Sequence, residues 1–414
     1  MSPLRYLASL CLRGGAQTRL GRRKELEVLV KIGNHPREYD WGSKTLLADA
    51  LNIEATGREM AELWFGTHPI SEAFEVDSNS PLSKLLGGEF GLMAKFLAAE
   101  HPLSIQLHPN ALQAEAGFAA ENGAGLDLAD ASRTFRDDKA KREAIVAITE
   151  FELLAGLLPA AQIAKVLEEL GELVSEGSGA LLARYAALLL SVDGHRAMLG
   201  DILAGDQPSD LQAGLLNELV ALAQTNQEFR YADAALLRLL TTRFGADRGL
   251  LLALTMQRFK LEPGAAMFVE TGVPHCYLSG LGVEVMTSSD NVLRGGLTHK
   301  HVSTSDFMAM LDVAEALKTS TTVPRQLGAG LWRYDFAAEE FVVHRLSVSG
   351  ANMLIDFGLP GASILMCLSG ELAVSNSLEE RLVLRKGEAA YLSDDARFYS
   401  ITGSGDGLLA SATA

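Results

Sequence analysis

The centre of the chain is predicted to be helical by the spacing of its apolar residues. Between Pro159 and Phe244, apolar positions recur every three or four residues, which places them on one face of a helix. Two examples are the sets Ile163, Val166, Leu167, Leu170 and Leu211, Leu215, Leu219, Leu222. Glycines and Pro208 separate such segments. The pattern predicts a block of about four to six helices over residues 158–244.

The segments on both sides of this block have the shorter period of β-strands. Residues 143–157 alternate in a β-rich run and predict a buried strand. After residue 245, short apolar runs alternate with glycine-rich turns, which is typical of a small barrel or sandwich. The segments EPGAAMFV (residues 262–269) and RKGEAAYL (residues 385–392) resemble each other. This similarity suggests two barrels of related design.

Local signals predict the elements that precede the helical block. A polar turn leads to a helix that is expected to begin at Lys44, with Ser43 as its N-cap. The run LMAKFLAAE (residues 92–100) fits a helix or a strand, because short apolar runs do not separate the two. A helix ending at Gly123 and a polar loop over residues 131–143 are expected to follow.

Composition excludes several classes of protein. The formal net charge of -16 argues against a basic surface for nucleic acid. No run of about 18 apolar residues is present, so no membrane span is expected. Cys11, Cys276 and Cys367 are far apart, which fits a reduced cytoplasmic protein better than a disulfide framework.

The first 27 residues form a basic extension that we expect to be disordered. Residues 1–24 contain basic side chains and no acidic residue before Glu25. Basic, acid-poor segments occur in organelle-targeting peptides. A tail, or a start codon assigned too far upstream, explains the same composition, and we expect one of these two.

The segment PLSIQLHPN (residues 102–110) carries the first candidate site. In an extended strand, alternate side chains share a face, so Ser104, Gln106 and His108 would point the same way. Pro109 ends strand pairing directly after them. An amide oxygen and an imidazole side by side can hold a metal ion or orient a sugar.

Two further candidate ligands lie downstream. His275 follows a proline in a turn between two β-runs, and Glu143 enters a strand from a polar loop. Together with Gln106 and His108 they would form a site of nitrogen and oxygen ligands that suits zinc, with iron(II) or manganese as alternatives. Glu284 alternates with apolar neighbours, so its buried charge would need a partner or a metal.

The loop SSDNVLRGGLTHKHV (residues 288–302) offers cations for an anionic ligand. Arg294 and Lys300 could clamp a phosphate, with Asp290 nearby, although an ordinary solvated loop has the same composition. His299 and His301 flank Lys300 and are interpreted as surface residues.

Several ordered blocks together resemble the type I mannose-6-phosphate isomerases, also called phosphomannose isomerases. The blocks are YDWGS, AELWFGTHP, PLSIQLHPN, AKRE followed by AIVAITEFELLAG, and GVPHCYLSGLGVEVMTSSDNVLRGGLTHK. The resemblance covers most of the chain from about Val28. It implies reversible isomerisation of mannose 6-phosphate and fructose 6-phosphate through a cis-enediol(ate).

The resemblance also assigns roles to residues. It implies one zinc ion per chain, held by Gln106, His108, Glu143 and His275. It implies catalytic roles for Arg294, Lys141, Glu284 and Asp290, and substrate contacts for Lys95, Ser104 and Lys300. The proton carrier stays open among Lys141, Glu284, Asp290 and a water molecule on the metal. The implied partner is a phosphorylated hexose, and we expect a monomer.

The fold implied by the resemblance is mostly β with an α-helical insertion: two cupin-type, jelly-roll-like β-barrels plus a helical domain. The expected division is a catalytic cupin domain (residues 28–157 and 245–318), a helical insertion (158–244) and a C-terminal cupin domain (319–414). The C-terminal barrel has no Q-x-H or P-H motif and is expected to be metal-free.

The chain departs from the family pattern at four positions. Ala140 and Arg142 stand where the family has histidine and proline, His299 replaces a proline, and Cys276 replaces an alanine. A role for an imidazole at position 140 is therefore excluded, and the substrate range is open. The alternatives to the isomerase are a non-catalytic sugar-binding or regulatory metal cupin and a metal-dependent cupin oxygenase.

Overall fold

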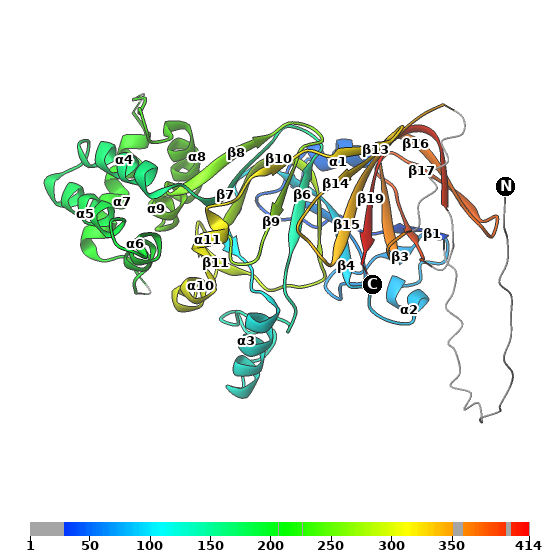
Figure 1. Cartoon of the computed structure of the whole chain (residues 1–414), viewed down its shortest axis with the longest axis horizontal. Helices are drawn as coiled ribbons and strands as arrows, with labels where there is room; N and C mark the ends of the chain where they lie inside the picture. Colours follow the sequence, from blue (N-terminus) through cyan, green and yellow to red (C-terminus); the bar gives the residue numbers. More distant parts are fainter. Residues whose placement is uncertain (1–28, 206, 226, 351–358, 395–398, 414) are drawn as a thin grey trace, which may run out of the picture.

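The structure, a computed structural model, describes most of the chain. The described residues are 29–205, 207–225, 227–350, 359–394 and 399–413. The expectations for the basic extension and for Cys11 concern residues outside these ranges. The described part is mostly β, with two antiparallel sheets and a group of helices, as expected (Figure 1).

The first sheet has ten strands and carries the candidate site. Its strands are β2 (Glu62–Phe65), β4 (Leu92–Ala99), β5 (Ile105–Leu107), β6 (Glu143–Ala147), β7 (Phe151–Leu157), β8 (Met256–Leu261), β9 (Ala266–Val269), β10 (His275–Thr287), β11 (Leu293–Gly296) and β12 (Thr321–Thr322). The main path runs β11, β5, β10, β6, β9, β12, and β4, β7, β2 and β8 join it through β10. Strand β10 pairs antiparallel with β4, β5, β6 and β7, so it brings distant parts of the chain together.

The second sheet has nine strands, most of them from the C-terminal part. They are β1 (Leu29–Gly33), β3 (Phe74–Glu75), β13 (Arg325–Gly328), β14 (Leu331–Tyr334), β15 (Phe341–Gly350), β16 (Ser363–Asn376), β17 (Arg381–Arg385), β18 (Ala389–Leu392) and β19 (Tyr399–Ala412). Their order is β13, β14, β15, β19, β16, β18, β1, β3, with β17 on β16. Strand β1 pairs with β18, so the start of the described chain completes a sheet of C-terminal strands.

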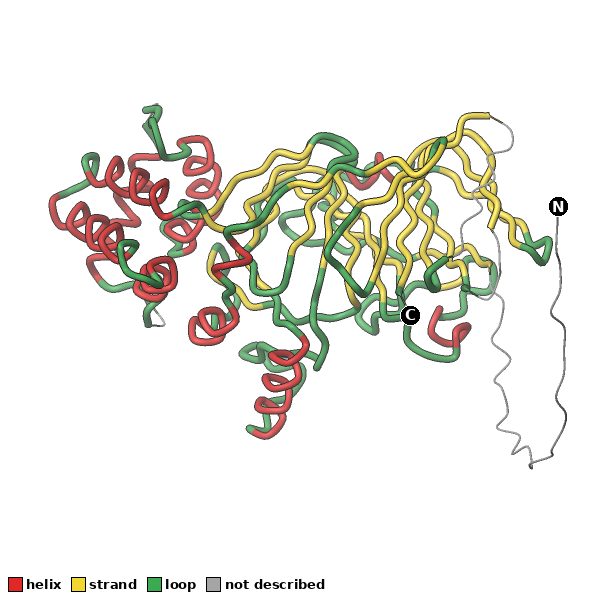
Figure 2. The backbone as a smooth tube through the Cα atoms, viewed as in Figure 1, coloured by secondary structure: helices red, strands yellow, loops and turns green. Residues whose placement is uncertain are grey.

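The helices of the described chain are α1 (Leu46–Leu51), α2 (Leu82–Leu86), α3 (Ala111–Gly123), α4 (Ala160–Gly171), α5 (Glu176–Leu188), α6 (Gly194–Ile202), α7 (Asp210–Ala223), α8 (Ala234–Phe244), α9 (Gly249–Ala253), α10 (Thr304–Met310) and α11 (Val313–Ala316). Helices α4 to α9 gather at one end of the molecule, whereas the other helices lie along or below the sheets (Figure 1). The predicted helical block is confirmed, because α4 to α8 are the five helices found in the described part of residues 158–244. Figure 2 shows this block beside the strands, while α3 projects from the body. Within the described ranges, every helix is too short or too polar to cross a membrane.

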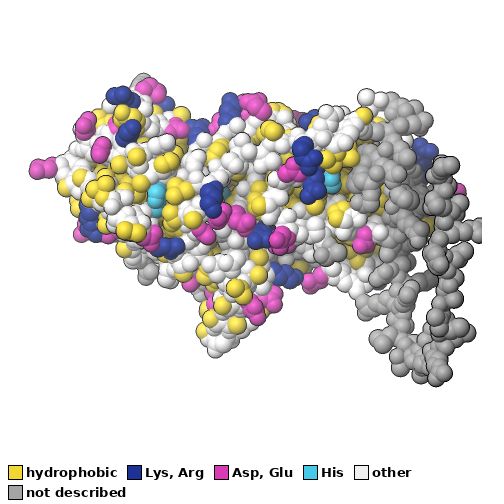
Figure 3. Space-filling view, in the orientation of Figure 1, with side chains coloured by type: hydrophobic (Ala, Val, Ile, Leu, Met, Phe, Trp, Pro, Cys, Tyr) yellow, Lys and Arg dark blue, Asp and Glu magenta, His cyan; other side chains and the backbone are white. Residues whose placement is uncertain are grey.

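The two sheets share a hydrophobic core. Phe65 and Phe96 of the first sheet belong to the same buried cluster as Phe341 and Ile364 of the second. A separate cluster joins the helical block to the end of the first sheet, through residues such as Leu154 of β7. The burial of both clusters ties the three parts into one body. On the visible surface, acidic and basic side chains are interspersed (Figure 3).

The ambiguous segments before and after the polar loop are strands. LMAKFLAAE forms β4, whose residues are all buried between β2 and β10. Tertiary pairing therefore decides a segment that local propensity leaves open. Residues 143–157, predicted as one strand, form two, because the chain turns at 148–150 where Thr149 bonds to Leu281 of β10.

Two predictions about helices need correction. Helix α1 begins at Leu46 rather than Lys44, although the Ser43 hydroxyl still accepts from the N–H of Thr45 and Leu46. In α7 the predicted leucine stripe is rotated, since Leu211 is exposed. The buried face consists of Gln212, Leu215, Leu216, Leu219 and Ala223.

The two similar turn segments have the same backbone geometry. Gly264 precedes β9 with φ 87°, and Gly387 precedes β18 with φ 86°. In each turn an i+3 N–H donates to the carbonyl of residue i, from Ala265 to Glu262 and from Glu388 to Arg385. Only glycine adopts this positive φ without strain, which explains why both segments contain it.

Candidate metal centre

Three donors converge where β5, β6 and β10 meet. His108 follows β5, Glu143 begins β6 and His275 begins β10. Their ligand atoms all lie within 4.8 Å of one another, and all three side chains are buried. The convergence depends on the turn before β10, where Gly272 with φ 75° donates its N–H to the carbonyl of His108.

The hydrogen bonds of the two imidazoles determine which nitrogen is free. His108 Nδ1 donates to the carbonyl of Asn291 at 2.7 Å, and His275 Nδ1 donates to that of Val273 at 3.1 Å. In a neutral ring the lone pair is then on Nε2. These atoms face Glu143, with His275 Nε2 2.9 Å from Oε1 and His108 Nε2 3.3 Å from Oε2. Lone pairs that face a carboxylate at these distances favour a cation between them.

Burial and charge keep His108 and Glu143 in the protonation states that metal ligands need. Burial, followed by the charge of Lys141, lowers the pKa of His108 to about 3. Burial alone would raise the pKa of Glu143, but Lys141 and His108 outweigh it and hold that pKa well below its usual value. A neutral imidazole and an ionised carboxylate can bind a metal without first losing a proton.

Lys141 lies within this group. Its Nζ donates to Glu143 Oε2 at 2.5 Å and is 3.0 Å from His108 Nε2. The ammonium therefore already compensates the buried carboxylate. Tyr277 Oη adds a longer bond of 3.4 Å to Glu143 Oε1.

The donors border a cavity of about 950 Å³. Its walls include ten of the eleven predicted site residues, namely Lys95, Ser104, Gln106, Lys141, Glu143, His275, Glu284, Asp290, Arg294 and Lys300. The eleventh, His108, is buried beside them. The sequence prediction therefore selected residues that the fold brings to a single place.

Gln106 lies between a metal donor and a cation on the sheet. In the strand register it is opposite His275 of β10 on one side and Arg294 of β11 on the other. Its side-chain amide makes no hydrogen bond to any other described residue. The amide is therefore available to a ligand in the cavity.

A second buried cluster surrounds Lys95. Its Nζ lies 2.5 Å from Glu284 and 3.2 Å from Glu62, which also accepts from the indole of Trp64 at 2.9 Å. One ammonium serves two carboxylates here. Burial, followed by the charge of Glu143, raises the pKa of Glu284, although the charge of Lys95 acts in the opposite direction. Glu62 and Trp64 were not assigned to the site from the sequence.

Another part of the cavity wall is cationic. Within the described part of the chain, no carboxylate is within ion-pair distance of Arg294 or Lys300. Burial, followed by the charge of Arg136, lowers the pKa of Arg294, and burial followed by Arg294 lowers that of Lys300. Arg136 also lines the cavity and was missed from the sequence. Its signal, a basic residue in a polar loop, does not separate it from other surface cations.

Asp290 has a buried histidine as its partner. His68 Nε2 is 3.3 Å from Asp290 Oδ2, while its Nδ1 accepts from the N–H of Ile70 at 3.4 Å. Burial would raise the pKa of Asp290, but His68 outweighs this effect and lowers it. His68 was not assigned a role from the sequence, because the contact crosses from the loop after β2 to the loop before β11.

The four departures from the family pattern have defined places. The carbonyl of Ala140 accepts from the hydroxyl of Thr287, and the guanidinium of Arg142 donates to Glu270 and Glu340. Cys276 is buried with its Sγ near the carbonyl of Leu103, and burial raises the pKa of its thiol. His299 is exposed at the rim of the cavity, as expected.

Comparison with known proteins gives consistent matches. Residues 29–160 match the family described as phosphomannose isomerase type I, catalytic domain. The mannose-6-phosphate isomerase of Salmonella typhimurium is 31% identical over 412 residues, covering 91% of this chain and 98% of the relative. That of Escherichia coli is 30% identical, with the same coverage.

Solved structures agree with these relatives. A zinc-bound mannose 6-phosphate isomerase is 28% identical with a TM-score of 0.79, covering 93% of this chain and all of the other. A single-site variant of the phosphomannose isomerase from Salmonella typhimurium is 27% identical with a TM-score of 0.81 and the same coverage.

Proposed function

Because the chain belongs to the type I phosphomannose isomerase family, we propose that it interconverts mannose 6-phosphate and fructose 6-phosphate. The observation that carries this proposal is the buried group of His108, Glu143 and His275 at a cavity that is also lined by Arg136, Arg294 and Lys300. A phosphorylated sugar needs both features, because it presents hydroxyl and carbonyl oxygens at one end and a dianion at the other.

The metal is zinc, one ion per chain. We propose Gln106, His108, Glu143 and His275 as its ligands. The facing lone pairs of the imidazoles and the carboxylate fit a cation, and nitrogen and oxygen donors suit zinc. When bound, zinc supplies a Lewis acid that polarises the carbonyl and hydroxyl oxygens of the substrate.

The reaction moves a proton between C1 and C2 of the open-chain sugar. A base removes the C2 proton and O1 takes up a proton, which gives the C1–C2 enediol(ate). O2 then loses its proton and becomes the carbonyl oxygen, while the base returns a proton to C1. Lys141, Glu284 and Asp290 line the cavity and are the proposed groups for this transfer. Among them, Glu284 has a raised pKa, which favours a carboxyl group that both accepts and returns a proton.

The phosphate is proposed to bind at the cationic wall. Arg294 and Lys300 lack acidic partners among the described residues, and Arg136 adds a third positive charge. Arg294 is also proposed to stabilise the negative charge of the enediolate. Ser104 and Lys95 line the sugar end of the cavity. Since Lys95 is paired with Glu62 and Glu284, we propose that it also fixes the position of Glu284.

The two sheets are proposed to be cupin barrels, a catalytic one and a metal-free C-terminal one, with residues 158–244 as a helical insertion. The matched turns at Gly264 and Gly387 support a duplication. In this division, the catalytic domain comprises residues 28–157 and 245–318, and the C-terminal domain comprises residues 319–414. Strands β1 and β3 belong to the catalytic domain by sequence but pair within the C-terminal sheet. We also propose a monomeric, cytoplasmic enzyme.

A coupled assay tests this function directly. Formation of fructose 6-phosphate from mannose 6-phosphate is measured on the purified full chain before chelation, after chelation and after zinc is restored. We expect activity that is lost on chelation and recovered with zinc. A folded, zinc-loaded protein without activity would contradict the isomerase and favour a sugar-binding protein.

A further inference from the structure

Arg142 connects three parts of the molecule through its guanidinium. Its Nε donates to Glu270 Oε1 at 3.0 Å, and its Nη1 donates to the two oxygens of Glu340 at 2.9 and 3.1 Å. All three side chains are partly buried, with 25%, 24% and 36% of their surface exposed. Charged pairs in such partly screened places are stronger than those on open surface.

Arg142 and Glu270, the two members of this network on the first sheet, are each close in sequence to a proposed metal ligand. Arg142 directly precedes Glu143 at the start of β6. Glu270 begins the short turn that leads to His275, and its Oε1 also accepts from the N–H of Thr271. The backbone of Arg142 is fixed as well, since its N–H donates to the hydroxyl of Thr287 at 3.1 Å. Arg142 therefore links the backbone segments that position Glu143 and His275.

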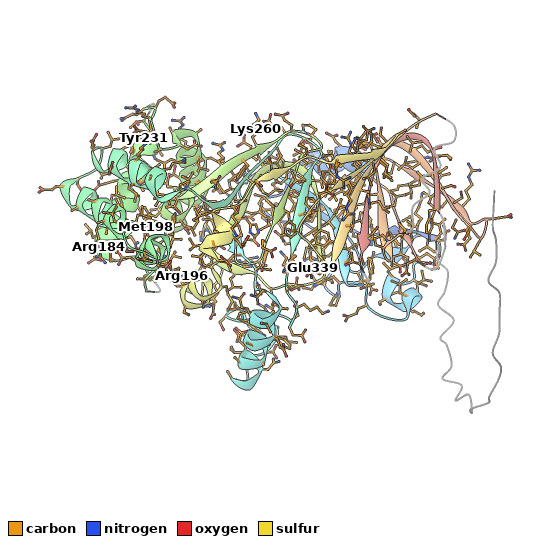
Figure 4. The ribbon with its side chains drawn as sticks, viewed as in Figure 1. Arg184, Arg196, Met198, Tyr231, Lys260 and Glu339 are labelled. Atoms are coloured by element: carbon orange, nitrogen blue, oxygen red, sulfur yellow. The ribbon has the colours of Figure 1, made fainter. Side chains whose placement is uncertain are left out.

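The third partner belongs to the other sheet. Glu340 directly precedes β15, and its carbonyl accepts from the N–H of Thr413 beyond β19. Figure 4 labels the preceding residue, Glu339, in the middle of the molecule, where the two sheets approach each other. No described residue after Lys300 lines the cavity. The C-terminal sheet therefore contributes none of its described residues to the cavity wall. The Arg142–Glu340 ion pair connects this sheet to the residue next to Glu143.

We propose that Arg142 is a positioning residue through which Glu340 of the C-terminal sheet and Glu270 hold Glu143 and His275 in the geometry that binds zinc. This inference rests on the proposed zinc site. It gives the C-terminal sheet a part in metal binding although that sheet supplies no ligand. Groups that orient metal ligands from behind typically change metal affinity by about 10- to 100-fold when they are removed.

The test compares the zinc affinity of Glu340→Gln and Arg142→Met with that of the unchanged chain. Zinc dissociation constants are measured by competition with a chromophoric chelator, and kcat and KM are measured with zinc in excess. We expect zinc to bind about tenfold more weakly or worse in both variants. The KM for mannose 6-phosphate should stay unchanged once zinc is saturating, because neither side chain lines the cavity.

Arg258→Met is the matched control. Arg258 is also partly buried, with 29% of its side chain exposed, and it joins Glu152 of β7 to Asp233 at the start of α8. It bridges two parts of the molecule in the same way but is not adjacent to any metal donor. We expect this variant to keep its zinc affinity, even where its free energy of unfolding falls.

The outcomes separate this inference from the proposed function. Unchanged zinc affinity in Glu340→Gln would overturn the inference, and so would an equal loss in Arg258→Met, which would indicate general destabilisation. If Arg142→Met fails to fold, Glu340→Gln still decides, because it leaves the Arg142–Glu270 pair in place. A chain that binds zinc without isomerase activity would contradict the proposed function alone.

Discussion

At the scale of single residues, Glu143 organises the metal centre. One of its oxygens faces His275, the other faces His108 and accepts from Lys141. The carboxylate thus sits among two metal donors and one cation. Removing its charge would leave Lys141 buried without its nearest counter-charge, which is far more costly than losing an exposed pair.

Arg294 gives the most direct test of chemistry at a single residue. Arg294→Met should lower kcat by about 100-fold or more, because an oriented cation near the developing enediolate would be lost. Zinc content should stay at that of the unchanged chain, since Arg294 is not among the grouped donors. The measurement is steady-state kinetics with zinc analysis of the same sample.

Arg294→Lys is the appropriate comparison. A lysine retains the charge but lacks the planar fork of donors, so an intermediate loss of kcat is expected. If Arg294→Met changed KM alone, Arg294 would contribute to phosphate binding only, and its proposed role in the transition state would be wrong.

Residue types, together with the resemblance of several ordered blocks to a known family, predicted the three grouped donors and ten of the residues that line the cavity. The sequence could not predict Arg136, His68 and Glu62, because each acts through a contact with a segment far away in the chain. Their local sequences resemble those of ordinary polar loops or strand edges. Such contacts depend on strand register, which single-residue patterns do not contain.

At the scale of elements, β10 determines the site more than any helix does. It places His275 and Glu284 on one strand and pairs them with β5, β6 and β4. The sequence predicted that Glu284 faces away from its apolar neighbours, and Val283 and Val285 indeed lie in the core. Strand limits were harder to predict, because β4 and the break between β6 and β7 depend on partners rather than on propensity.

The matched glycine turns allow a prediction about elements. At Gly387 a Cβ would lie 2.5 Å from Leu51 Cα, at the end of α1, whereas at Gly264 it would meet the end of the flexible Arg345 side chain at 2.9 Å. Both substitutions to alanine force a strained positive φ, worth roughly 1–3 kcal/mol. Gly387→Ala should be the more destabilising, because backbone cannot move away as a side chain can.

Urea unfolding of the two alanine variants measures this difference. Gly88→Ala serves as the control, since its Cβ would meet no atom within 4 Å. It should leave the free energy of unfolding nearly unchanged. Equal losses for Gly264→Ala and Gly387→Ala would show that the contact with α1 contributes nothing.

At the scale of the whole molecule, the two sheets are joined by a common core, and the N-terminal strand β1 belongs to the second sheet. The core contains residues from both, and β1 pairs with β18 across almost the full length of the chain. The order of β, helical and β regions was predictable from periodicity. The place of β1 in the second sheet was not, because a short strand carries no information about its distant partner. Shared burial of this kind predicts that both sheets unfold in one transition.

The pH dependence of the free energy of unfolding, through the buried His344, tests whether the two sheets unfold together. Burial, followed by the charge of Arg333, lowers the pKa of this residue on β15 to about 4. In the unfolded chain a histidine takes up a proton near pH 6.5, so between these values the unfolded state binds more protons and the fold loses stability as the pH falls. The loss from pH 7.5 to pH 5 should be roughly 2 kcal/mol from this residue.

His344→Gln should remove that part of the pH dependence, measured by urea unfolding of zinc-free protein at both pH values. Because the sheets share a core, tryptophan fluorescence and circular dichroism should report the same shift. A pH dependence that is unchanged in His344→Gln would mean that the folded protein accommodates a charged imidazole, and separate transitions would mean that the sheets unfold independently.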